Sequence, residues 1–231
     1  MSKLTWDAAK DRSYEYGISK GVHYTDKAAE GQNAAVKYGH GVAWDGLINV
    51  TDSPSGADNN KFYADNIEYA AIRAAEEYGC SVEAYQYPDE MAKCDGTESP
   101  VAGLYIHQQE RKPFGLCWRT EIGNAEQGMG VGYKLHLAYG LTASPTEEAA
   151  DTVNDSPDAK TFSWDMEGTP VAVTGMKPTA KIVIDSRKVD KTKLTALEAI
   201  LYGSANAEAR LPLPDEVITT LGGTVESGDS E

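Results

Sequence analysis

The stretch RKPFGLCWRTEIGNAEQGMGVGYKLHLAYG, residues 111–140, contains two arms in which apolar and polar side chains alternate. In the first arm, the residues that share one face are Phe114, Leu116, Trp118, Thr120 and Ile122. In the second arm, they are Tyr133, Leu135, Leu137, Tyr139 and Leu141. A period of two is typical of strands with one buried face. The glycines between residues 123 and 132 tolerate positive φ and let the chain reverse. The stretch therefore predicts an antiparallel hairpin at the centre of a β-rich domain.

The same alternation predicts further strands on both sides of this hairpin. They are expected at residues 80–87, 162–167 and 182–185, and at residues 39–50 with a bend at Asp45-Gly46. Residues 1–38 are polar and weakly patterned, which predicts an extended arm or a loosely attached first strand. TDSPSGADNN, residues 51–60, is expected to be a loop from its composition.

Residues 62–87 contain a stretch, NIEYAAIRAAEEYG, that is compatible with two structures. Ile67, Ala70 and Ala74 form a thin apolar stripe at helical spacing. Ile67 and Tyr69 begin an equally thin strand face. The local pattern does not decide between helix and strand.

Helices are predicted mainly near the end of the chain. Residues 194–201 have an apolar face, Asp190 can cap the helix, and Gly203 stands where it should stop. A short helix is expected at residues 214–221, and one helical turn at residues 88–94, because each begins with proline followed by acidic residues. The last residues, VESGDSE, are expected to be disordered.

The chain has 231 residues, a formal net charge of -15 and a pI of about 4.7. This charge argues against a protein that grips nucleic acid, because phosphate binding needs clustered lysine and arginine. No long linker divides the sequence, so one domain is predicted for residues 1–231, made of an N-terminal arm or strand (1–38), a β core with its helix (39–203) and a C-terminal segment (204–231). Neither a signal peptide nor a membrane span is apparent, which predicts no membrane partner.

A search for catalytic, cofactor-binding or metal-binding residues returns none. The cysteines and histidines lie far apart, without the spacing of zinc ligands or of a disulfide framework: Cys80, Cys94, Cys117, His23, His40, His107 and His136. The glycines at 128, 130 and 132 lead into a strand, so no helix N-terminus follows them to bind phosphate. We therefore expect no enzymatic activity, no cofactor and no metal.

Several blocks of the sequence closely resemble the major tail tube proteins of long, flexible-tailed, siphovirus-type phages and prophages of Gram-positive bacteria. The resemblance covers nearly the whole chain in order. The blocks include GVAWDGLINVTDSPSG, EAYQYPDEMAKCDG, QQERKPFGLCWRTEIGN, GYKLHLAYG and PVAVTGMKPTAKIVIDS, of which RKPFG and PVAVTGMKPTA are the most specific.

The resemblance implies a mainly β fold, sandwich-like or barrel-like, of two packed antiparallel sheets with a flanking α-helix. It implies hexameric rings that stack into the tail tube of a virion assembled in the host bacterial cytoplasm. The implied partners are other copies of the chain, the tape-measure protein, and the tail terminator and tail-tip proteins. DNA would pass through the lumen without specific binding. Residues 62–87 would then be two long strands joined near residues 76–79.

The resemblance also implies where copies meet. The segment placed toward the neighbouring ring contains Asp52, Ser53, Pro54, Ser55, Gly56, Ala57, Asp58 and Asn59. The arm at residues 1–38 is expected to make a similar contact. An acidic lumen would repel the phosphate backbone of passing DNA, and Glu83 and Asp165 are the candidates to face it.

Three other functions are compatible with the sequence. A monomeric β-sandwich that binds glycans would also be acidic and rich in tyrosine and tryptophan. A tube protein of a contractile or secretion system would share the architecture. A cytosolic enzyme of unrecognised type would need a pocket with strongly shifted pKa values.

Overall fold

The computed structural model describes residues 6–27, 37–150, 152 and 158–225. Its strands are β1 (Ser13–Asp26), β2 (Tyr38–Trp44), β3 (Leu47–Asp52), β4 (Ser55–Gly56), β5 (Asn59–Ala64), β6 (Ile67–Arg73), β7 (Glu76–Ala84), β8 (Glu98–Val101), β9 (Leu104–Ile106), β10 (Phe114–Asn124), β11 (Gly128–Ala143), β12 (Phe162–Gly168) and β13 (Lys181–Asp185). Its helices are the 3-10 turn η1 (Ala9–Asp11) and the α-helices α1 (Asp89–Cys94), α2 (Lys191–Tyr202) and α3 (Pro214–Thr220).

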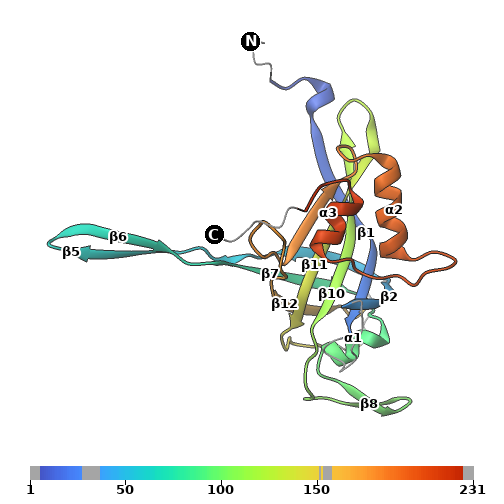
Figure 1. Ribbon diagram of the computed structural model, residues 1–231. Coiled ribbons are helices and arrows are strands. Elements are labelled where there is room, and N and C mark those ends of the chain that lie inside the picture. The colour runs from blue at the N-terminus through green and yellow to red at the C-terminus, as the bar shows by residue number, and fades with distance from the viewer. Residues whose placement is uncertain (1–5, 28–36, 151, 153–157, 226–231) are drawn as a thin grey trace.

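One antiparallel sheet of nine strands forms the body of the molecule (Figure 1). Its strand order is β2-β1-β10-β11-β12-β7-β3, with β13 also paired to β11 and β4 paired to β7. The predicted hairpin of residues 111–140 is confirmed as β10 and β11, the two strands in the middle of this order. Two further pairs, β5-β6 and β8-β9, stand apart as separate hairpins.

The sheet folds back on itself around an inner core. β2 and β3 lie at opposite ends of the strand order, yet only Asp45 and Gly46 separate them in sequence. Buried side chains from both halves of the sheet pack together between the halves: Trp44, Val82, Leu116, Trp118, Leu141, Trp164 and Met166 among them. The expected mainly β, sandwich-like fold is therefore confirmed, and its two layers are halves of one continuous sheet. The bend predicted within one strand is a corner between two strands.

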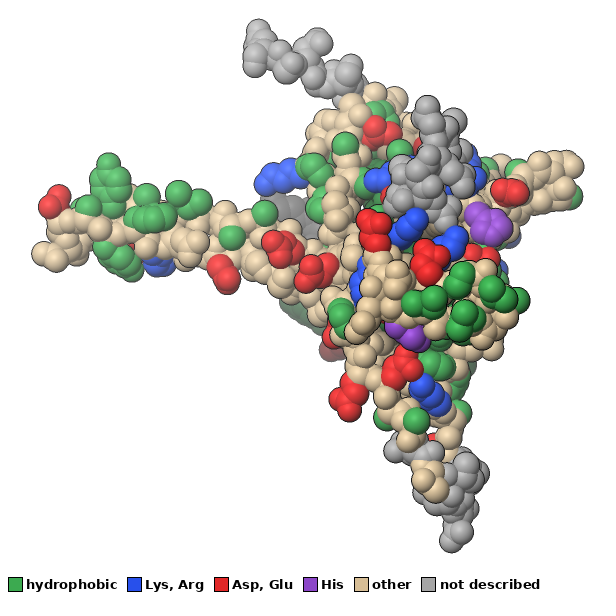
Figure 2. All heavy atoms as spheres, turned by 90° about the horizontal axis from the view of Figure 1, so that it is seen from below, with side chains coloured by type: hydrophobic (Ala, Val, Ile, Leu, Met, Phe, Trp, Pro, Cys, Tyr) green, Lys and Arg blue, Asp and Glu red, His purple; other side chains and the backbone are tan. Residues whose placement is uncertain are grey.

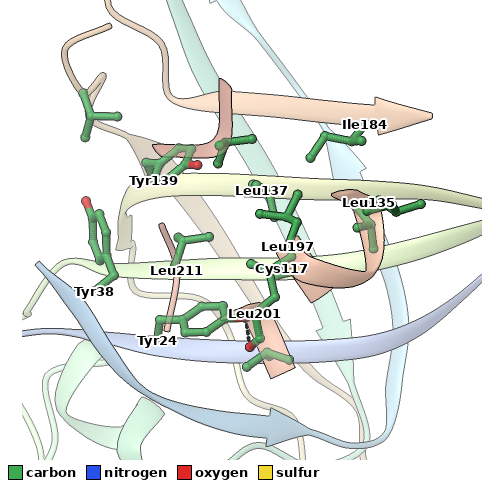
Figure 3. Packing of buried hydrophobic residues seen from close by; sticks show 14 residues of the cluster. Tyr24, Tyr38, Cys117, Leu135, Leu137, Tyr139, Ile184, Leu197, Leu201 and Leu211 are labelled. Carbon is green, nitrogen blue, oxygen red and sulfur yellow. Dashed lines mark hydrogen bonds between the residues drawn. The ribbon is translucent and has the colours of Figure 1, made fainter. Parts of the chain in front are cut away.

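An outer core lies on the opposite face of β1, β10 and β11, under α2 and α3 (Figure 3). Leu137, Tyr139 and Leu197 are fully buried there. The Tyr24 hydroxyl donates a 2.7 Å hydrogen bond to the Leu201 carbonyl and so joins β1 to the end of α2. The prediction of one buried face for the central hairpin was thus wrong, because two helices from the end of the chain cover its second face. Gly140, with φ +59°, interrupts the alternation, and Leu141 packs in the inner core.

The first strand is more central than the sequence predicted. β1 pairs with β10 on one side and with β2 on the other. Its residues are mostly exposed at the start and buried on both faces near the end, so no period of two appears in the sequence. The loosely attached strand was therefore a wrong expectation. Residues 1–5 and 28–36 of the predicted arm lie outside the described residues.

The helices follow their sequence signals. The Asp190 carboxylate accepts hydrogen bonds from the backbone N–H groups of Thr192 and Lys193, at 2.9 and 3.1 Å, and so caps α2. Gly203 ends the helix with φ +79°. α1 and α3 also form where proline and acidic residues predicted them, so the fold contains two short helices in addition to the flanking helix α2.

A histidine is buried without charge in the inner part of β1. His23 has no exposed surface, stacks on Phe114 with ring centroids 4.9 Å apart, and contacts the Cys94 Sγ atom at 3.5 Å. Burial, ahead of repulsion from His40, lowers the pKa of His23 to about 3. The folded protein therefore holds this imidazole neutral, whereas an unfolded chain protonates it near its ordinary pKa.

We expect the free energy of unfolding to fall as the pH decreases from about 6.5 toward 3, because the unfolded state binds the extra proton over this interval. The contribution of one such group is up to about 1.4 kcal/mol per pH unit. Urea unfolding at several pH values should show a shallower slope for His23→Phe than for the unmodified protein. His107→Gln is the control, because His107 is exposed and does not contribute to the lowered pKa of His23. Equal slopes for all three proteins would contradict the prediction.

Candidate functional site

The hairpin of β5 and β6 projects from the body as a long arm (Figure 1). Every residue of both strands is exposed. The strands are joined at Asp65 and Asn66, whose φ values of +50° and +64° suit a two-residue hairpin turn. The strand interpretation of this region is confirmed. The junction between strands that the resemblance placed near residues 76–79 lies close by, between β6 and β7 at residues 74–75, whereas the chain reverses earlier, at Asp65 and Asn66, which tolerate the left-handed conformation.

The arm has one apolar face and one polar face. Cross-strand partners share a face of a hairpin and successive residues alternate. The register therefore puts on the apolar face Asn60, Phe62, Ala64, Ile67, Ala70 and Ile72. It puts on the polar face Asn59, Lys61, Tyr63, Glu68, Ala71 and Arg73. Lys61 and Glu68 form an ion pair of 2.8 Å on the polar face.

The apolar face is open to solvent. Phe62, Ile67 and Ile72 are 50%, 64% and 61% exposed. Figure 2 shows hydrophobic side chains along the length of the arm. Burying one such side chain stabilises a protein or a complex by about 1.5–3 kcal/mol. A contiguous apolar face that the described chain leaves uncovered is typical of a contact surface.

The residues predicted to form a ring-stacking loop form the stem of this arm. Asp52 ends β3, Ser55 and Gly56 are β4, and Asn59 begins β5. Backbone hydrogen bonds hold the stem to residues 74–79: the Ser53 N–H donates to the Gly79 carbonyl at 2.8 Å, and the Ala74 N–H donates to the Asp58 carbonyl at 2.8 Å. The expectation of a loop was wrong, because backbone pairing needs no apolar pattern. All eight residues, Pro54 and Ala57 included, are exposed.

Asp52 fixes the stem to the body. Its carboxylate accepts a 2.8 Å hydrogen bond from the Tyr78 hydroxyl and forms an ion pair with Lys181 on β13. Burial, ahead of the nearby Cys80 and Asp52, raises the pKa of Tyr78, so the hydroxyl stays protonated as a donor. Asp52 therefore has a structural role, and its place in a contact between rings stays a prediction.

Glu83 and Asp165 lie on adjacent strands and on the same face. Glu83 on β7 is opposite Ser163, and Asp165 on β12 is opposite Ser81. Both carboxylates are exposed, while their neighbours Val82 and Trp164 point into the inner core. The structure thus brings the two acidic candidates together on the outer surface of the body. Their place at a lumen stays a prediction.

A second exposed hairpin, β8-β9, was not identified from the sequence. It turns at Ala102 and Gly103, the latter with φ +83°. Its exposed apolar side chains, 44–64% accessible, are Val101, Leu104, Tyr105 and Ile106. The available signal was the pair Ala102-Gly103 followed by the apolar run of residues 104–106.

The described residues offer little for chemistry. Among them, no group of three or more His, Cys, Asp and Glu side chains is placed to hold a metal ion. Cys80, Cys94 and Cys117 are buried. Burial raises the pKa of Cys80 to about 11 and that of Cys117 to about 12, so these two thiols are protonated at neutral pH. No helix in the described part of the chain is long and apolar enough to cross a membrane.

Comparison with known proteins gives little more. No protein-family model matches the chain, and no curated protein matches it in sequence. Among solved structures, the chain is similar to a chain of an extracellular contractile injection system, the PVC sheath-tube complex in its extended state. The identity is 11% and the TM-score 0.32, over 80% of this chain and 99% of that chain. A similarity of this size carries no argument about function, which has to come from the geometry of the arm.

Proposed function

We propose that the protein is a self-assembling structural protein whose hexameric rings stack into the tail tube of a phage virion. The observation that carries the proposal is the arm, a ribbon with one apolar face that the described chain leaves uncovered. The hairpin adds little to the stability of a monomer in water, because a lone two-stranded hairpin is marginally stable. Contact with another copy would cover the apolar face and stabilise the hairpin at the same time.

The rest of the proposal follows the sequence resemblance. The chain acts as one tube domain, residues 1–231, that encloses the tape-measure protein, meets the terminator and tail-tip proteins at the ends of the tube, and conducts DNA without catalysing a reaction. The stem at residues 52–59 contacts the neighbouring ring. Glu83 and Asp165, with the net charge of -15, keep DNA from adhering to the wall.

Assembly is tested by negative-stain electron microscopy of the purified full chain over a concentration series, with the solution mass measured on the same samples. We expect hexameric rings or hollow tubes whose proportion rises with concentration. Particles that stay monomeric at every concentration and salt, and that bind immobilised glycans, would replace the proposal with the glycan-binding alternative. Tubes that form only when a second, sheath-like protein surrounds them would favour a contractile system.

A further inference from the structure

We infer that the apolar face of the β5-β6 arm docks on the β8-β9 hairpin of a second copy of the chain. The inference rests on the proposed function and names the surface that receives the arm. It starts from the second exposed hairpin, for which the resemblance assigned no role.

The β8-β9 hairpin has an apolar face of its own. Val101 and Leu104 are cross-strand partners and share a face, and Ile106, two residues beyond Leu104, lies on that face too, with its cross-strand partner Glu98 at the edge. They are 64%, 50% and 44% exposed. Glu98 is the only charged residue of the two strands. The apolar face of β8-β9 on one copy can therefore cover the apolar face of the arm on another copy.

Charge favours this pairing between copies. Each chain carries a net charge of -15, so most surfaces of two copies repel each other. The apolar face of the arm contains no carboxylate, because Glu68 lies on the polar face beside Lys61. The face of β8-β9 that contains Val101 and Leu104 carries one carboxylate, that of Glu98 opposite Ile106, so the contact brings no two acidic groups together. These two patches let like-charged copies approach closely.

The directions of the two hairpins require the contact to be between copies. The arm projects from the side of the body, whereas β8-β9 projects from its lower end (Figure 1). The backbone hydrogen bonds of the stem hold the arm in its direction. A contact between two different patches is heterologous, and repeating it generates a closed ring or a helical filament. Pairing of two arms would instead close a dimer.

Cysteine cross-linking tests the contact. One sample of the full chain carries Ile72→Cys, another carries Leu104→Cys, and the two are mixed under mild oxidation. The three native cysteines are buried, so they do not compete for cross-linking. Ala71→Cys replaces Ile72→Cys in the control, because Ala71 is adjacent but lies on the polar face. We expect the Ile72 mixture to form disulfide-linked dimers at least about tenfold faster than the control, since docking raises the effective concentration of the paired thiols.

Three outcomes would overturn the inference. Disulfide dimers in the Ile72→Cys sample alone, as fast as in the mixture, would show that arms pair with arms. Rings or tubes seen by microscopy in the same mixture without a cross-link would leave the proposed function standing and place the receiving surface elsewhere. A mixture with neither assemblies nor cross-links would remove the proposed function as well.

Discussion

Replacing Phe62 and Ile72 together by serine is expected to abolish assembly while leaving the monomer folded. Both side chains lie on the apolar face of the arm, 50% and 61% exposed, and outside both cores. Full burial of such a side chain contributes about 1.5–3 kcal/mol, and about half of each is still exposed, so the loss of both weakens each contact by roughly 1.5–3 kcal/mol. The association constant should fall by roughly one to two orders of magnitude.

The matched control is the pair Lys61→Ser and Ala71→Ser, two neighbouring positions on the polar face of the same strands. Sedimentation velocity and electron microscopy report assembly, and thermal unfolding reports the fold. The double variant on the apolar face should sediment as a folded monomer at concentrations where the control assembles. Assembly of both variants at the same concentration would remove the arm as the assembly surface.

Leu197→Ala is expected to lower the free energy of unfolding by about 2–5 kcal/mol, because it removes a fully buried side chain and leaves a cavity. Leu197 anchors α2 on the outer face of the central strands, beside Leu135 and Leu137 (Figure 3). Urea denaturation of the monomer measures the change. Thr195→Ala, on the exposed side of the same helix, should shift the free energy by no more than about 0.5 kcal/mol. Equal effects of the two substitutions would mean that α2 does not close the outer core.

The candidate site was only partly predictable. Residues 52–59 were predicted to be a contact segment from the resemblance to tail tube proteins. They belong to the projecting element, of which they form the stem. The apolar face of the arm escaped prediction because Phe62, Ile67 and Ile72 form a surface only once the register between the strands is known. The turn at Asp65 and Asn66 sets that register, and a shift of one residue would move each of these side chains to the other face.

Local sequence determined the elements whose signals are complete within a few residues. The alternation in β10 and β11, the carboxylate of Asp190 at the start of α2 and the glycine at its end each act through neighbours in the chain. β10 and α2 were predicted close to their observed bounds, whereas β11 begins at Gly128, inside the stretch that was predicted to be the turn. The charge of -15 likewise argued against nucleic-acid binding without any structure, and this expectation stays a prediction.

Only the tertiary structure decided which surfaces are buried. β1 is a central strand because it pairs with β2 on one side and with β10 on the other. The second face of the central hairpin is buried because α2 and α3, from the end of the chain, cover it. The residues that α2 and α3 bury on these strands, such as Tyr24 and Cys117, form no apolar run, so this burial could not be predicted from the local pattern. The arm is the converse case. It keeps an amphipathic pattern, yet nothing described in its own chain covers the apolar face, since the body lies out of its reach.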